Sequence, residues 1–217
     1  MRLKGAKIVQ NWVLLLPGQG NGLRVRSAAG RRKLRCGAEP AAVPSPTMTL
    51  LRSRPPFDAD ERTQLLGWLD MQRALILWKC EGLSEEDAHR SVLSTSPYMT
   101  MAGLVSHTRW VEHCWFQVLF LGGPAKGPQF DEGPEDADMR VEGIPLAQLQ
   151  REYEQQCALS NEIVAGHSLD DAGRHPDFRV SASSLRWMLL HMIEETARHA
   201  GHADVIRELL DGEKGYY

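Results

Sequence analysis

Four long stretches of the chain carry apolar residues at spacings of three and four, the period of a helix with one buried face. The last is the clearest: it opens at a serine cap, Ser183 or Ser184, runs to Leu210 and ends at Gly212. Its inner stripe consists of Leu185, Leu189, Met192, Thr196, His199, Ala203, Ile206 and Leu210. A stripe of this length must be covered by other helices, so it predicts a helical bundle.

The other stretches support the same fold. The predicted long helices span about 58–80, 100–122, 145–164 and 183–211, and Ser84 caps a brief extra turn. Residues 124–143 and 165–182 are rich in Pro, Gly and polar side chains and are predicted loops. A loop as long as 124–143 is often a lid or a binding element. Because no stretch shows useful strand alternation, the predicted fold class is all-α, a four-helix bundle with a flexible N-terminal extension.

Charge divides the chain into two parts. Residues 1–47 hold nine Lys/Arg and one acidic residue, whereas residues 48–217 hold 16 basic and 27 acidic residues. With the proline-rich stretch 40–46 just before Met48, this predicts that 1–47 is a basic, disordered extension or a mis-assigned start, and that 48–217 is the folded domain. Mass spectrometry of the native protein tests the start. An acidic domain repels phosphates, which argues against nucleic acid as its partner.

The cysteines point to a reducing compartment. Cys36, Cys80, Cys114 and Cys157 form no C-x-x-C pair, which argues against a zinc ribbon and a disulfide framework. A cytoplasmic location is therefore expected. Residues 12–16 loosely imitate a secretory signal, but such signals need about 7–15 apolar residues. No apolar run reaches the length of about eighteen residues that a membrane span requires.

Three residues predict a metal site. Glu195 and His199 are four apart in the last helix and so lie on one face, and His107 lies on the apolar stripe of the second. A carboxylate and two imidazoles from facing helices suit one divalent metal, and three protein ligands leave a position open, as in catalytic sites. A buried Glu195 is costly unless it is paired or metal-bound. Spacing alone leaves open that the histidines are ordinary core residues and that Glu195 lies at the bundle rim.

Two histidine-bearing stretches carry a resemblance. LVSHTRWVEHCW at 104–115 and EETARHAGHAD at 194–204 resemble the DinB-like superfamily. The most similar branch is the actinobacterial one with mycothiol-dependent maleylpyruvate isomerase and mycothiol S-transferase, and DGEKGY at 211–216 also resembles it. The similarity covers about 55–217 and leaves 1–47 out. It is specific at the two histidine-bearing helices.

This resemblance implies a four-helix bundle in which His107, Glu195 and His199 hold a divalent metal, zinc or nickel. Many superfamily members have histidine where this chain has Glu195, whereas the isomerase is similar to this chain in having glutamate there. The implied activity is transfer of a low-molecular-weight thiol, or a thiol-dependent isomerisation, with the thiol as co-substrate and a small electrophile as partner. A metal-dependent hydrolase and a non-catalytic protein that binds a metal or small ligand stay open as alternatives, as does a homodimer. No membrane partner is expected.

Several neighbours are candidates for the surroundings of the site. His191 is two helical turns, about 12 Å, from His199, so one metal cannot take both, and His191 is expected behind the metal or in the core. His202 is expected beside the site opening or on the surface, and Trp110 in the core or in a pocket wall. Arginines that could anchor an anionic substrate, or pair on the surface, are Arg109, Arg179, Arg186 and Arg198.

Two further residues of the second helix are assigned roles away from the metal. Glu112, five residues after His107, is expected to be a solvated or helix-pairing carboxylate. Cys114 lies two turns from His107 and is expected to be a buried structural thiol. A catalytic cysteine would need a cationic or metal-activated setting, and nothing near Cys114 in the sequence provides one.

Overall fold

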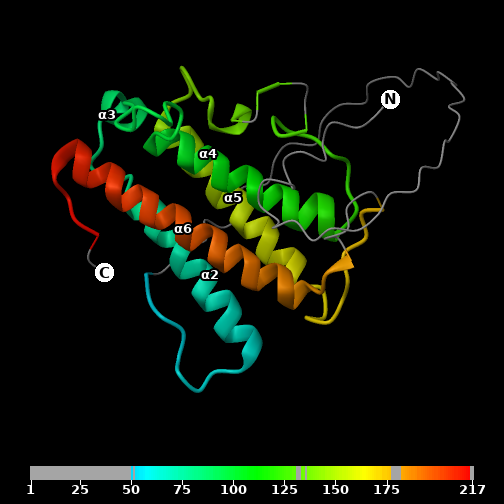
Figure 1. The fold of residues 1–217 in the computed structure, drawn as a ribbon. Helices are drawn as coiled ribbons and strands as arrows, with labels where there is room; N and C mark the ends of the chain where they lie inside the picture. Colours follow the sequence, from blue (N-terminus) through cyan, green and yellow to red (C-terminus); the bar gives the residue numbers. More distant parts are fainter. Residues whose placement is uncertain (1–49, 51, 131–132, 135, 177–181, 216–217) are drawn as a thin grey trace, which may run out of the picture.

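The fold is a bundle of helices, as the sequence predicts. A computed structural model describes residues 50, 52–130, 133–134, 136–176 and 182–215 (Figure 1). Its helices are α2 (Glu61–Trp78), α3 (Glu85–His89), α4 (Met101–Glu112), the π-helix η1 (His113–Phe120), the 3-10 helix η2 (Ala137–Met139), α5 (Leu146–Ala165) and α6 (Leu185–Asp211). Within the described ranges, extended pairing is limited to one isolated bridge between Ala172 and Ser184. The all-α bundle is therefore confirmed.

The N-terminal part of the chain lies outside this description. The predicted disorder of 1–47 falls on residues that the structure does not describe, so it stays a prediction, as do the start at Met48 and the domain limits 48–217. In the described part of the chain, no helix combines the length and the apolar character needed to cross a bilayer.

Polar caps fix where the long helices begin. Asp60 accepts a hydrogen bond from the Thr63 amide at the start of α2, and Thr100 accepts one from the Gly103 amide at the start of α4. Ser184, one of the two predicted caps, does the same for α6. Such bonds satisfy amides that the helix itself leaves unpaired. The observed helix limits therefore lie within a few residues of the predicted ones.

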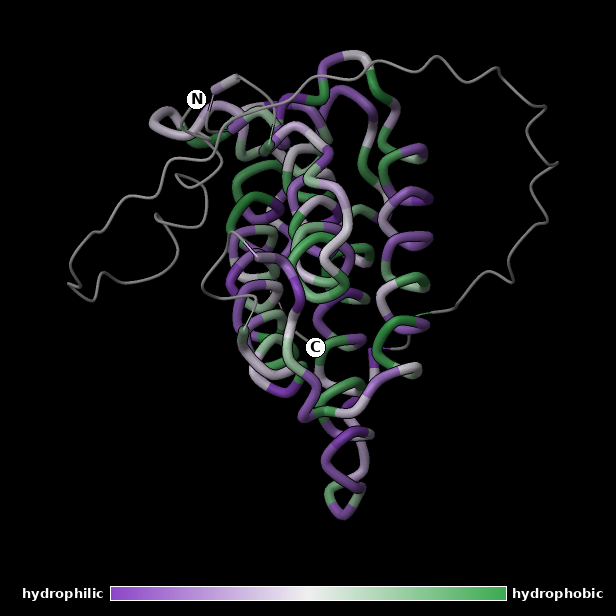
Figure 2. Tube along the Cα trace, turned by 90° about the vertical axis from the view of Figure 1, so that its right-hand side faces the viewer, coloured by the Kyte–Doolittle hydropathy of each residue, from purple (hydrophilic) through white to green (hydrophobic). Residues whose placement is uncertain are grey.

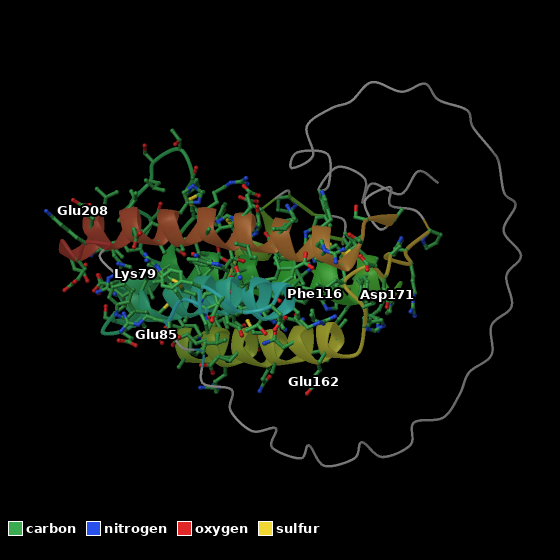
Figure 3. The ribbon with its side chains drawn as sticks, turned by 90° about the horizontal axis from the view of Figure 1, so that it is seen from below. Lys79, Glu85, Phe116, Glu162, Asp171 and Glu208 are labelled. Atoms are coloured by element: carbon green, nitrogen blue, oxygen red, sulfur yellow. The ribbon has the colours of Figure 1, made fainter. Side chains whose placement is uncertain are left out.

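The core of the bundle consists of two apolar clusters with a layer of buried polar residues between them. α6 packs on α2 and on α4, and α4 packs on α5 (Figure 1). The colours of Figure 2 alternate between hydrophobic and hydrophilic along each helix, as expected for helices with one buried face. Figure 3 shows Phe116 among the helices, whereas Glu162 and Glu208 lie on the outside. Buried apolar side chains form two clusters, one containing Met101 and Ile206, the other containing Phe116 and Leu185.

Between these clusters every long helix contributes a buried polar residue. The layer consists of Arg73 from α2, His107, Thr108 and Glu112 from α4, Ser160 from α5, and Glu195, Thr196 and His199 from α6. Burying so many polar groups is unfavourable unless they bind one another or a ligand. This layer is therefore the candidate location of a ligand-binding or catalytic site.

One half of the polar layer is an ion pair. The Arg73 guanidinium donates to both carboxylate oxygens of Glu112, over 2.6 and 2.7 Å, and both side chains are fully buried. Arg73 also donates to Asp70 and Asn161. Of the two expectations for Glu112, solvation is wrong, whereas pairing agrees with the structure: this carboxylate pairs across the core with another helix. Two such charges are tolerated inside a protein only because they satisfy each other.

The second long helix changes its hydrogen-bonding pattern halfway. The predicted helix over 100–122 has the expected extent, but residues His113–Phe120 are wound as a π-helix, with the Leu121 amide bonded to the Phe116 carbonyl. A π-helix has an extra residue per turn and often lies near a functional site. Here it directly follows Glu112 and carries Trp115 against the α6 residues His191 and Trp187.

Candidate metal centre

The other half of the polar layer brings together the three predicted ligands. His107 projects from α4, and Glu195 and His199 project from successive turns of α6. His107 Nε2 lies 3.7 Å from Glu195 Oε1, and His199 Nε2 lies 3.1 Å from the same oxygen. The centroids of the two imidazole rings are 4.6 Å apart. One ligand atom from each residue lies within 4.8 Å of the others, and all three residues are buried.

This donor set fits a divalent transition metal. Zinc binds imidazole nitrogen and carboxylate oxygen at about 2.0–2.2 Å, which separates two ligand atoms of a tetrahedron by about 3.4 Å. The separations of 3.7 and 3.1 Å lie on either side of that value. Two imidazoles and one carboxylate also suit nickel. The three side chains could therefore hold one ion with small rotations and leave room for a further ligand.

A fourth residue, which the sequence analysis missed, binds the back of His107. Asp138 lies on η2, in the long loop between η1 and α5, and its Oδ2 is 2.9 Å from His107 Nδ1. The side chain is nearly buried, with 10% of its surface exposed. The loop was predicted as a lid or a binding element, but its five acidic residues, from Asp131 to Asp138, gave no means of choosing among them.

Charges around the triad shift the pKa values of its members. Burial lowers the pKa of His107, but the hydrogen bond to Asp138 and the nearby carboxylates of Asp138 and Glu195 outweigh burial and raise it to about 9. Burial raises the pKa of Glu195, yet the two histidines hold it well below its usual range. The pKa of His199 is lowered, mainly by burial. When no metal is bound at neutral pH, Glu195 is therefore an anion and His107 is an imidazolium cation.

Metal binding should consequently release a proton. A metal ligand must be deprotonated, and the His107 pKa of about 9 means that the metal displaces a proton below that pH. We expect the zinc or nickel affinity to rise roughly tenfold per pH unit from pH 7 to 8.5 and to level off above pH 9. Calorimetric titrations in buffers of different ionisation enthalpy measure the protons released. Release of none at pH 7.5 would contradict the shift.

Two polar side chains border the triad on α6. Arg198 Nη1 lies 3.1 Å from Glu195 Oε2, the oxygen that does not face the histidines, and Arg198 also pairs with Glu194. His202 Nδ1 lies 3.4 Å from His199 Nδ1, on the side of that ring away from Glu195. Both are partly exposed. They connect the buried triad to the surface of α6.

His191 belongs to an aromatic row instead of the triad. Its ring stacks on Trp187 at 5.6 Å between centroids and lies 4.4 Å from the ring of Trp115. Burial lowers the His191 pKa. His191, one turn before Glu195, was expected behind the metal or in the core; its side chain is 15% exposed, and its ring contacts are with Trp115 and Trp187. Trp187, at 43% exposure, is the outermost ring of the row.

The remaining candidates that the structure describes contact residues outside the triad. Trp110 packs against Gly127 of the long loop, near the ring of His113, and its carbonyl accepts from Gln129. Arg109 pairs with Glu152. Arg186 pairs with Glu61 and Asp170 on the surface. Arg179 falls outside the described residues. None of these contacts involves the triad, so among the predicted arginines that the structure describes, Arg198 is the one next to it.

The described cysteines are poor nucleophiles. Cys80, Cys114 and Cys157 are buried and free. Burial raises the pKa of Cys80 and of Cys114 to about 12, and that of Cys157 well above its usual value. A thiol with a pKa near 12 is ionised to roughly one part in 10⁵ at pH 7. The expectation that Cys114 is a buried thiol is thus in agreement with the structure.

A shallow hollow of about 590 Å³ lies on another face of the bundle. Its lining, mostly apolar, comes from α2 and α6 and includes Trp68, Leu190 and Ile193. His107, Glu195 and His199 do not line it. The shape and lining of this hollow therefore do not indicate which small molecule would bind at the triad.

One comparison with known proteins identifies a family. A family model described as mycothiol-S-transferase matches residues 64–212, which include α2 from its fourth residue onward, the whole of α4, α5 and α6, and the whole triad. No curated protein and no solved structure matches the chain.

Proposed function

The chain belongs to the mycothiol-S-transferase family, and we propose that it transfers a low-molecular-weight thiol of the mycothiol type to a small electrophile. The observation that carries this proposal is the triad: one anionic and two imidazole ligands, buried between α4 and α6 in the matched region. In this reaction the thiol sulfur forms a bond to the electrophilic carbon, the leaving group departs with the bonding electrons, and the thiol proton passes to solvent.

His107, Glu195 and His199 would hold the metal, zinc in the first instance and nickel in the second. A bound divalent metal supplies Lewis acidity, which favours the thiolate form of a coordinated thiol. Three protein ligands leave a coordination position for it. Glu195 would be the only anion among the three protein ligands. A divalent ion together with these ligands would therefore keep a net positive charge, which suits an anionic sulfur.

Two neighbouring residues of α6 contact the triad. Arg198 engages Glu195 Oε2 and so directs Oε1 toward the two histidines. His202, next to His199 and partly exposed, is placed to exchange a proton with solvent beside the triad. Because the buried protein thiols stay protonated at neutral pH, the nucleophile is best supplied by a small co-substrate.

A direct assay tests the proposal. The purified protein, loaded with zinc or nickel, is mixed with mycothiol and monobromobimane, and the fluorescent thioether is followed with time. We expect catalysed formation of the adduct with release of bromide, and loss of the catalysis on chelation. Glutathione in place of mycothiol tests whether the thiol is recognised.

The same material separates the alternatives. Hydrolysis of activated esters or amides by the metal-loaded protein, without any need for a thiol, would favour the hydrolase, because the same ligand set can activate water. Stoichiometric metal binding without turnover of any of these substrates would favour a binding protein. Either result would overturn thiol transfer as the function.

A further inference from the structure

We propose that Asp138 is the positioning residue of the metal centre: the loop turn η2 docks on α4 so that the Asp138 carboxylate fixes the ring of His107 and presents Nε2 to the ion. This inference rests on the proposed metal site and adds a residue from outside the two ligand-bearing helices. It also gives the long connection between η1 and α5 a role in metal binding.

Two polar contacts hold the turn against α4. The Ser106 hydroxyl donates to the Asp138 carbonyl over 2.6 Å, and the Asp138 carboxylate lies 2.9 Å from His107 Nδ1. At Gly103, an added Cβ would collide with the carbonyl oxygen of Tyr98 and lie 3.1 Å from that of Met139, so the glycine permits the close approach of both segments. The two contacts come from Ser106 and His107, which are adjacent on α4, and together they set the position of Asp138 relative to His107.

The chemistry of the contact determines which ring nitrogen is presented. An ionised carboxylate can only accept hydrogen bonds, so Nδ1 of His107 carries the hydrogen of this bond. The lone pair available to a metal is then on Nε2, the nitrogen that faces Glu195 Oε1 at 3.7 Å. A carboxylate behind a ligating imidazole also makes the ring a better donor to the metal.

His199 provides an internal contrast. Its Nε2 also faces Glu195, but its Nδ1 lies 3.4 Å from an imidazole nitrogen of His202, and that partner is itself partly exposed. A neutral imidazole stabilises a neighbouring N–H less than a buried carboxylate does. Of the two histidines, His107 is therefore the one whose orientation depends on a charged residue from a loop.

The test compares wild type with Asp138→Ala, Asp138→Asn and Ser106→Ala. Zinc dissociation constants are measured at pH 7.5 by competition with a chromophoric chelator, and thermal unfolding checks the fold of each variant. We expect Asp138→Ala to weaken zinc binding about 10–100-fold. Asp138→Asn should weaken it less, because the amide oxygen still accepts from Nδ1. Ser106→Ala removes a contact of the turn but keeps the carboxylate, and should have the smallest effect.

A spectroscopic measurement distinguishes positioning from simple support of the fold. In zinc-loaded wild type, the Nδ1–H of His107 should give a downfield proton resonance protected from exchange, which Asp138→Ala should remove. If Asp138→Ala is poorly folded, Asp138→Asn decides. Zinc binding by wild type together with unchanged affinity in both Asp138 variants would overturn the inference alone. A wild type that binds no divalent metal would overturn the metal site as well.

Discussion

Replacing His199 by alanine is expected to weaken zinc binding at least a hundredfold and to abolish thiol transfer at limiting metal. Structural zinc sites with four ligands bind with about 10–16 kcal/mol, so one ligand contributes on the order of 3 kcal/mol, or more than two powers of ten. We expect this full ligand contribution to be lost in His199→Ala, because His199 Nε2 lies 3.1 Å from Glu195 Oε1 and 99% of the His199 side chain is removed from solvent. Little space is left for a replacement ligand from the chain.

The chain offers a matched control for this variant. His202→Ala removes an imidazole three residues away on the same helix, next to His199 but on the far side of its ring. Metal content after dialysis, measured by inductively coupled plasma mass spectrometry, should stay near wild type in His202→Ala and fall sharply in His199→Ala. Equal metal content and equal transferase activity in the two variants would remove His199 from the site.

The ligand triad was predictable because helical spacing and resemblance agree. Glu195 and His199 are one turn apart, and any helix through them places both on one face, whatever its neighbours are. His107 follows from the apolar stripe of its own helix, which has to face the core. Sequence could therefore indicate which side chains point inward, and the structure adds that they meet at the same height of the bundle.

Asp138 could not be identified in the same way. It belongs to a loop without period, and only the docking of η2 on α4 distinguishes it from the neighbouring acidic residues. The π-helix is similar: nothing in HCWFQVLF breaks an α-helical pattern, so the change of hydrogen bonding after Glu112 reflects packing against neighbouring helices. Both features depend on contacts between distant segments, which local patterns do not contain.

The partnership of Arg73 and Glu112 was missed for another reason. Composition favours solvent for both residue types, and neither lies near the other in the sequence. Once the helices pack, the pair occupies the polar layer beside the triad, with both side chains at 0% exposure. The layer thus contains two separately satisfied groups of charges: an ion pair between α2 and α4, and the candidate metal centre between α4 and α6.

Breaking this ion pair should have the largest effect on stability of any single change considered. Glu112→Leu leaves the Arg73 guanidinium buried without the carboxylate that takes two of its hydrogen bonds. Loss of one partner from a buried pair costs about 3–5 kcal/mol. For a domain of this size each kcal/mol lowers Tm by about 2–4 °C, so we expect a fall of about 6–20 °C by scanning calorimetry.

A second variant tests whether the cost comes from the orphaned charge. Arg73→Met combined with Glu112→Leu removes both charges and fills similar space, so it should recover most of the lost Tm, because replacing a whole buried pair by apolar residues is often neutral. Arg186→Met, which breaks ion pairs on the surface, serves as the control and should change Tm little. A double variant no more stable than Glu112→Leu would show instead that the pair itself stabilises the bundle. In that case the polar layer would contribute to folding as well as to metal binding.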